Sequence, residues 1–330
     1  MIGPANATIA RYEGVLHSIP NADVLLSLLT AQEAVLSSRI EGTQATLGEV
    51  LNYRAALQEA TARLADLPLS QRLLKDTHRV LMQGVRGRHK SPGEYRKIPN
   101  WIGSHGCTIE EARFIPCPVN HLPETMATWE RYLHGETSDR LGQLALVYAE
   151  FEALHPFLDG NGRLGRLIVP LFLFEKGLLS SPNFYISEHL EHKWDGYYEH
   201  LLAVSWYGEW TGWVAFFLRA LIAQGETNQD RALKILALYD QRKDWITEQI
   251  HSQYAVRTLD WFFSRPIFKT SDFVADSCIP KPTANRILRE VRDAGLLVEL
   301  RPSVGRVRQC WRFASWSILP REPRCFEAHV

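Results

Sequence analysis

The sequence predicts a mainly α-helical protein with a shorter C-terminal part in which helices are followed by a two-stranded ribbon. Helix is favoured because apolar residues recur at steps of three and four over several long segments. The helical period is lost around residues 102–118 and again at 295–313, and both stretches favour strands. With 330 residues, 45% hydrophobic and 22% charged, the chain is long enough for two or more domains.

Two predicted helices frame the stretch from His155 to Arg166. Residues 141–154 keep helical spacing, and the helix should end just before His155 because Pro156 discourages its continuation. A second helix is predicted from about Asn161, and it is apolar nearly all round, so it should be buried. The residues between the two helices therefore form a tight loop.

The loop has the composition of an anion site. Gly160 and Gly162 allow the backbone to turn and expose its N–H groups, and the free N–H groups of the helix's first turn point into the same space. Arg163 and Arg166 are unfavourable in that first turn because the helix dipole favours negative charge there. We therefore expect an anion opposite these two arginines.

Two further loop residues suit chemistry on a phosphate. His155 is the only loop group that exchanges a proton near neutral pH. Asp159 is the only loop carboxylate, and Mg²⁺ beside phosphates commonly takes one protein carboxylate. A His-Pro at a helix end or a Gly-Asn-Gly is an ordinary structural feature when it occurs alone. The prediction depends on all of them lying within twelve positions.

Residues 155–166 read His-Pro-Phe-Leu-Asp-Gly-Asn-Gly-Arg-Leu-Gly-Arg and resemble the signature of the Fic domain family, His-Pro-Phe-x-Asp/Glu-Gly-Asn-Gly-Arg-x-x-Arg, at every specified position. The resemblance covers about residues 1–225. It implies an all-helical core with a β-hairpin flap that moves AMP from ATP to a hydroxyl of a target protein, or of itself. It also implies that His155 is the catalytic base and that Asp159 holds Mg²⁺. The implied ligands of the ATP phosphates are Gly160, Asn161, Gly162, Arg163, Leu164, Gly165 and Arg166.

A second motif precedes the core. Residues 21–42 predict an amphipathic helix whose last turn contains Glu41, where the helix dipole disfavours a negative charge. Residues 37–42 are similar to the family's inhibitory motif, Ser/Thr-x-x-x-Glu-Gly/Asn. The similarity implies an inhibitory role for Ser37 and Glu41, with Glu41 paired to Arg166 so that ATP binds unproductively. The alternative is a glutamate exposed to solvent.

The resemblance assigns two further parts of the core. Residues 102–118 predict a β-hairpin, with a plain surface loop as the alternative. The family's hairpin binds the target by strand addition, and the implied flap residues are Ile102, Gly103, Phe114 and Ile115. Tyr197 or Tyr198 would lie against the adenine, although aromatic residues at this density are more often part of a core.

We predict four regions: a helical region at 1–90 with the inhibitory helix at about 21–42, a Fic core at 91–225, a linker helix at 226–254 and a winged-helix domain at 255–330. The core contains the flap at 102–118 and the active-site loop at 155–166. Further helices are predicted at 47–64, 69–85, 191–202, 212–222 and 229–250. The winged-helix prediction is based on predicted helices at 255–263, 270–276 and 281–294 and on predicted strands at 295–300 and 307–313.

Charge is distributed unevenly along the chain. Residues 1–254 carry 24 basic and 29 acidic side chains, whereas residues 255–330 carry 13 and 8. The predicted third helix and wing offer polar and basic groups suited to DNA: Lys281, Thr283, Asn285, Arg286, Arg289, Arg292, Arg301, Arg306 and Arg308. DNA contact through residues 281–312 is one interpretation, and a protein-binding or dimerising module is another.

Two alternative functions remain open at this point. The same core could remove AMP, since a glutamate that blocks ATP could instead orient a water. Alternatively, the protein could be a winged-helix transcriptional regulator whose core senses a nucleotide, although His155 and Asp159 disfavour a pure sensor.

No run approaches eighteen apolar residues and residues 1–4 do not resemble a signal peptide, so we expect a cytoplasmic protein without a membrane segment. We also expect a homodimer and five free cysteine thiols.

Overall fold

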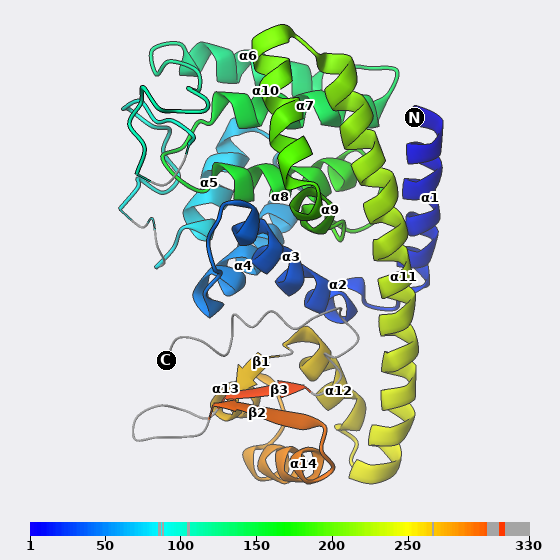
Figure 1. Cartoon of the computed structure of the whole chain (residues 1–330). Helices are drawn as coiled ribbons and strands as arrows, with labels where there is room; N and C mark the ends of the chain where they lie inside the picture. The colour runs from blue at the N-terminus through cyan, green and yellow to red at the C-terminus, as the bar shows by residue number, and fades with distance from the viewer. Residues whose placement is uncertain (85–86, 88, 104–105, 266, 302–309, 314–330) are drawn as a thin grey trace. The chain divides into compact units, whose positions relative to one another are not determined.

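Helices make up most of the computed structural model, which describes residues 1–84, 87, 89–103, 106–265, 267–301 and 310–313 (Figure 1). This confirms the mainly α fold class. The helices are α1 Ile2–Ser18, α2 Ala22–Leu25, α3 Ser27–Ile40, α4 Leu47–Arg63, α5 Gln71–Leu81, α6 Leu122–His134, α7 Arg140–Leu154, α8 Asn161–Glu175, α9 Ser187–His192, α10 Trp194–Tyr207, α11 Trp210–Ile250, α12 Ala255–Ser264, α13 Thr270–Asp276 and α14 Lys281–Asp293. The strands are β1 Ile267–Lys269, β2 Leu297–Arg301 and β3 Cys310–Phe313.

The chain forms two compact units. The first contains residues 1–13 and 33–227, and the second contains residues 14–32 and 228–330. Each unit has its own core, and the two are described separately below. None of the helices within the described ranges is both long and apolar enough to cross a membrane. Cys107, Cys117 and Cys278 are free thiols, as predicted.

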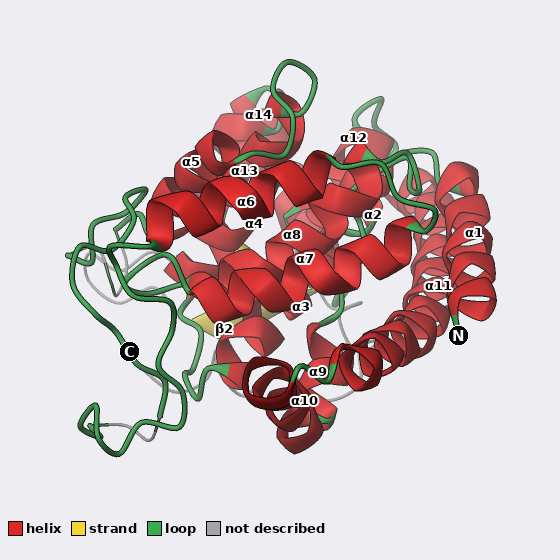
Figure 2. Ribbon diagram, turned by 90° about the horizontal axis from the view of Figure 1, so that it is seen from above, coloured by secondary structure: helices red, strands yellow, loops and turns green. Residues whose placement is uncertain are grey.

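Helix α8 lies at the centre of the first unit. It contacts α4, α5 and α7, and its side chains from Arg163 to Leu173 are buried, which explains why its sequence is apolar nearly all round. Figure 2, in which every helix is red, shows α8 among the helices that contact it, α4, α5 and α7. Two indoles join α7 to its other neighbours, since Trp129 of α6 and Trp213 of α11 donate to the carbonyls of Val147 (2.9 Å) and Ala145 (2.7 Å). The packing of α7 and α8 fixes the end of α7 and the start of α8, which meet at the predicted loop.

The predicted helix at 21–42 is broken, and this corrects the prediction of one continuous helix. Helix α2 ends at Leu25, Leu26 has φ −89° and ψ 5°, and α3 begins at Ser27. In the second unit α2 contacts α12, and the Ser27 hydroxyl donates to the carbonyl of Phe263. Tertiary packing on both sides of Leu26, which is fully buried, therefore overrides the local helical pattern.

The two helices predicted at 212–222 and 229–250 form a single helix, α11. The segment between the two predicted helices contains Gly225. A Cβ at Gly225 would lie 2.7 Å from Cγ2 of Thr8 in α1. The glycine therefore allows α1 to pack closely against α11, and it does not end the helix.

The predicted β-hairpin at 102–118 is reduced to a single antiparallel bridge among the residues described there. Ile102 and Phe114 exchange two backbone hydrogen bonds of 2.9 and 3.0 Å. Between them the chain turns, because Glu111 N–H donates to the Thr108 carbonyl and the Glu111 carboxylate accepts from Thr108 N–H. These local hydrogen bonds compete with the strand ladder. Whether this segment binds a target by strand addition stays a prediction.

The second unit contains a three-stranded antiparallel sheet in the order β1-β3-β2. The helices predicted at 270–276 and 281–294 agree with α13 and α14, whereas β1 was not predicted. The basic side chains Lys281, Arg286, Arg289 and Arg292 of α14 are exposed, although Arg286 and Arg292 are paired with Glu290 (2.6 Å) and Asp293 (2.8 Å). Arg306 and Arg308 lie outside the described residues, as does the side chain of Arg301. The winged-helix assignment and the DNA contact stay predictions.

Candidate functional site

His155 marks the end of α7, as predicted, with its backbone in the left-handed region at φ 47° and ψ 59°. Its N–H still donates to the carbonyl of Phe151 (3.0 Å), and Pro156 then prevents another helical turn. Burial lowers the pKa of the His155 imidazole to about 4, against the smaller opposing effect of the Glu152 carbonyl. The ring is therefore neutral at physiological pH and is in the state that can accept a proton.

Arg96 holds the end of α7 in place. Its guanidinium donates to the carbonyls of His155 (2.9 Å), Leu154 (3.3 Å) and Cys117, and its backbone N–H donates to the carbonyl of Pro156 (2.9 Å). The side chain is only 3% exposed. Arg96 was not among the predicted site residues. The structure shows that it joins the segment after the 102–114 bridge to the predicted catalytic loop.

We expect the Arg96→Met variant to lose about 2 to 4 kcal/mol of unfolding free energy, because it leaves three buried or part-buried carbonyls without their donor. Urea unfolding followed by circular dichroism measures this loss. Lys97→Met is the matched control, since Lys97 is the next residue and its side chain is 86% exposed. Equal stability of the two variants would show that the Arg96 clamp contributes nothing.

Asn161 closes the loop. Its side chain accepts from Phe157 N–H and donates to the Phe157 carbonyl, both at 2.8 Å, and Asn100 donates to the same carbonyl at 3.1 Å. The side-chain amide of Asn161 is therefore used in holding the loop. The part of Asn161 that is left for a ligand is its backbone N–H in the first turn of α8. The first intrahelical bond runs from Leu164 N–H to the Gly160 carbonyl (3.0 Å), so the N–H groups of residues 161–163 precede the helical ladder. Leu164 itself is buried.

We use the term anion nest for the N–H groups of residues 161–163 together with the side chains of Arg163 and Arg166. Gly160 caps α8 at φ 76°, a conformation that favours glycine. A Cβ on Gly162 would lie 2.8 Å from Oε1 of Glu41 and 2.9 Å from Nη1 of Arg166. The absence of a side chain at Gly162 is what lets the charged groups lie directly on the backbone of α8.

Glu41 contacts both arginines of the nest. Its Oε1 accepts from Nη2 of Arg166 at 2.9 Å, and its Oε2 lies 3.4 Å from Nε of Arg163. Ser37 also binds Arg166, through its hydroxyl (2.6 Å) and its carbonyl (2.8 Å). Arg166 is 1% exposed and Glu41 24% exposed, so the pair is largely removed from water. The contact implied by the two motifs is thus present, and solvent exposure of an unpaired Glu41 is excluded.

Asp159 lies at the edge of the nest, and His78 fixes its backbone. His78 Nδ1 accepts from Gly93 N–H (2.8 Å), so its Nε2 carries the proton and donates to the Asp159 carbonyl (2.9 Å). The ring stacks on Phe157 at 3.9 Å, and burial lowers its pKa to about 4. His78 was not among the predicted site residues, and its only signal in the sequence was a polar residue on the buried face of a predicted helix.

The residues present fit a magnesium ion that is shared with phosphates. Asp159 is 38% exposed, and its Oδ1 accepts from Gly160 N–H at 2.6 Å. Within the described ranges, no cluster of three or more His, Cys, Asp or Glu residues could hold a metal by itself. Mg²⁺ beside phosphates needs only one or two protein carboxylates, because phosphate oxygens and water complete its shell. Mg²⁺ binding by Asp159 remains a prediction.

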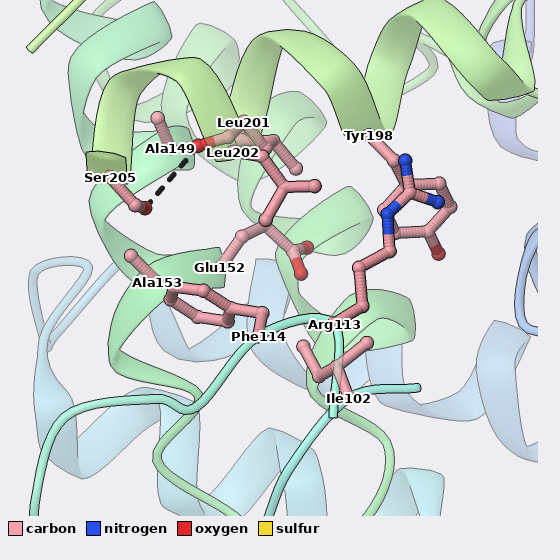
Figure 3. A pocket seen from close by; sticks show the side chains of 10 residues that line it. All are labelled: Ile102, Arg113, Phe114, Ala149, Glu152, Ala153, Tyr198, Leu201, Leu202 and Ser205. Atoms are coloured by element: carbon pink, nitrogen blue, oxygen red, sulfur yellow. Dashed lines mark hydrogen bonds between the residues drawn. The ribbon is translucent and has the colours of Figure 1, made fainter. Parts of the chain in front are cut away.

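A pocket of the first unit is lined by Tyr198 and not by Tyr197 (Figure 3). Tyr197 is 1% exposed, and its hydroxyl bonds that of Tyr148 at 3.0 Å inside the aromatic core. The pocket is mainly apolar, and its walls come from the 102–114 segment, α7 and α10. Its lining residues are Ile102, Arg113, Phe114, Ala149, Glu152, Ala153, Tyr198, Leu201, Leu202 and Ser205. Of the predicted flap residues, Ile102 and Phe114 line it, whereas Ile115 is 56% exposed.

Fold and site together define an all-helical core whose central helix begins with the anion nest. Comparisons with known proteins agree with the fold and show the family. A family model described as Fic/DOC family matches residues 68–173, and one described as Fic/DOC family N-terminal matches residues 1–81. The chain belongs to the Fic/DOC family.

Similar proteins include a probable protein adenylyltransferase of Aquifex aeolicus, 25% identical over 169 residues, which are 47% of this chain and 51% of the relative. The protein adenylyltransferase Fic of Drosophila grimshawi is 25% identical over 192 residues, 53% of this chain and 37% of the relative. The chain thus spans about half or less of the length of these relatives.

Solved structures share the fold. A Fic family protein from Desulfovibrio desulfuricans superposes with a TM-score of 0.55 at 18% identity, covering 94% of each chain. Fic-1 from C. elegans gives a TM-score of 0.52 at 18% identity, covering 71% of each.

Proposed function

We propose that the protein transfers AMP from ATP to a hydroxyl side chain of a protein and releases pyrophosphate. The observation that carries the proposal is the loop between α7 and α8, which joins a neutral buried histidine to an anion nest with two arginines. The names of the curated relatives support the same reaction. The protein itself is included among the expected acceptors.

In this reaction His155 accepts the proton of the attacking hydroxyl. The hydroxyl oxygen bonds to the α-phosphorus, the bond from that phosphorus to the bridging oxygen of the β-phosphate breaks, and pyrophosphate leaves with the electron pair. The nest would stabilise the negative charge that spreads over the phosphates, through the N–H groups of residues 161–163 and the guanidinium of Arg163. Asp159 would hold Mg²⁺, which supplies further positive charge to the phosphate oxygens when it is bound.

We propose further that Glu41 restrains this activity. Its carboxylate occupies Arg166 at 2.9 Å, in the place where the outer phosphates of ATP would bind. A triphosphate that loses this arginine would bind in another pose, with its α-phosphorus out of line with the incoming hydroxyl. The restraint is strong because breaking a buried pair leaves a charge uncompensated.

Incubation of the chain and of its Glu41→Gly variant with Mg²⁺ and labelled ATP tests the proposed reaction. We expect label from the α-phosphate to become attached to protein, and label from the γ-phosphate to leave in pyrophosphate. Attachment of the γ-label would instead indicate phosphoryl transfer. ATP binding without attachment of either label would favour the nucleotide sensor, and release of AMP from previously modified protein would favour AMP removal.

A further inference from the structure

Glu152 is a buried carboxyl group to which the proposed mechanism gives no role. It lies one turn before His155 on α7, and Figure 3 shows its carboxyl group pointing into the pocket. Its Oε1 has no hydrogen-bond partner among the described residues. The carboxyl group packs against α8, where a Cβ on Gly165 would lie 2.4 Å from the same oxygen. Glu152 therefore connects the pocket with the helix that carries the anion nest.

Few other polar groups of the pocket are available to a ligand. The Ser205 hydroxyl donates to the Leu201 carbonyl at 3.3 Å, as drawn in Figure 3, and the backbones of Ile102 and Phe114 bond each other. The Arg113 guanidinium lies over the Tyr198 ring, 5.9 Å from its centre. Most of the remaining lining is aliphatic or aromatic, which suits a flat base. Glu152 is the one carboxyl group among the lining residues.

We propose that Glu152 reads the edge of the purine base, so that the pocket selects adenine when the carboxyl group is protonated and loses that selection when it is ionised. This inference rests on the proposed function, because it assumes that the pocket takes the base of ATP. A protonated carboxyl group offers one donor and one acceptor, which matches an adenine ring nitrogen and the neighbouring amino group. An ionised carboxylate offers acceptors only, which matches the two adjacent N–H donors of guanine.

The surroundings of Glu152 bring the change in its protonation state into the physiological pH range. Burial raises the pKa of the Glu152 carboxyl group to about 7, Arg166 opposes the rise, and the negative charge of Glu41 adds to it. The titratable and charged groups that face it are Arg166 of α8, Glu41 after α3, Arg113, Tyr148 of α7, and Tyr197 and Tyr198 of α10. Because ATP binds the protonated form, its affinity is full below this pKa and falls as the pH rises through it.

The test measures the dissociation constants of ATP and GTP by titration calorimetry, with the full unchanged chain as the parent because Glu41 contributes to the pKa of Glu152, at about pH 6 and about pH 8.5. We expect the parent to prefer ATP by about tenfold or more at the lower pH and to lose most of this preference at the higher pH. Titration of the γ-phosphate affects both nucleotides and cancels in the ratio of the two constants.

Two variants at position 152 separate base reading from mere packing. Glu152→Gln keeps one donor and one acceptor at every pH, so it should retain the ATP preference and make it independent of pH. Glu152→Ala should lose both the preference and its pH dependence. A pH-dependent ratio in the Gln variant, or an ATP preference in the Ala variant, would overturn the inference. If neither variant folds, the parent chain alone decides: the inference is overturned when the ratio of its ATP and GTP dissociation constants does not change with pH.

Failure of this inference is distinguishable from failure of the proposed function. If ATP binds and its α-label is transferred but the position 152 variants leave the ATP-to-GTP ratio unchanged, only the role of Glu152 is wrong. If neither nucleotide binds the parent, both the proposed function and the role of Glu152 are wrong.

Discussion

Replacement of Glu41 by glycine is expected to raise transfer of AMP by about two to three orders of magnitude. The expected size follows from the buried pair, because breaking such a pair costs about 3 to 5 kcal/mol and each 1.4 kcal/mol corresponds to a factor of ten. In the variant Arg166 keeps its bonds to Ser37 but loses its only carboxylate within 4 Å among the described residues. The measurement is the initial rate of α-label attachment at saturating ATP.

Glu136→Gly is the matched control for this experiment. Glu136 is an exposed residue in the loop before α7, at the opposite end of that helix from His155, so its loss should leave the rate unchanged. Ser37→Ala removes one of the bonds to Arg166 and should give a smaller rise. A rate in Glu41→Gly that equals the rate of the unchanged chain would refute the restraint, even though the contact itself exists.

Loss of His155 is expected to abolish transfer, with a fall of about 10²-fold to 10⁴-fold when measured in the Glu41→Gly chain. The hydroxyl then has no group to accept its proton, whereas the anion nest keeps its ligands for the phosphates. ATP affinity measured by calorimetry should therefore stay within about twofold of that of the Glu41→Gly chain, because the change removes a group that acts in the transition state.

Two substitutions are needed at this position because of its backbone. His155 has a left-handed conformation, which alanine adopts with strain and asparagine tolerates. Asparagine lacks a proton-accepting ring, so His155→Asn should be as inactive as His155→Ala while remaining closer to the parent in stability. Activity in the Asn variant alone would show that the histidine supports the loop and does not act as a base.

The sequence allowed the local parts of the site to be predicted. The ends of α7 and α8 follow from helical spacing, Pro156 and the glycines, all within a few residues, and the motifs led to the pairing of Glu41 with Arg166. The position of Tyr198 in the pocket was one of two predicted alternatives. These features depend on neighbours in the chain or on a family signature, so one sequence contains enough information for them.

The supporting residues could not be predicted because their partners are far away in the chain. Arg96 bonds carbonyls of residues 117 and 154–155, and His78 bonds the carbonyl of Asp159. Nothing near either residue indicates those partners. The same reason explains the continuous α11, where Gly225 is needed for a contact with Thr8 more than two hundred residues away. The homodimer, the cytoplasmic location and the contact with DNA remain predictions.

The bridging position of Glu41 has a thermodynamic consequence. Under the proposed restraint, the carboxylate of Glu41 and a triphosphate would compete for the guanidinium groups that Glu41 contacts, so their binding would be linked, and the linkage would be reciprocal. Any molecule that draws the end of α3 away from α8 must tighten triphosphate binding by some factor, and triphosphate must then tighten the binding of that molecule by the same factor. An activator of this protein would therefore reveal itself as a ligand whose affinity rises when the nucleotide is present.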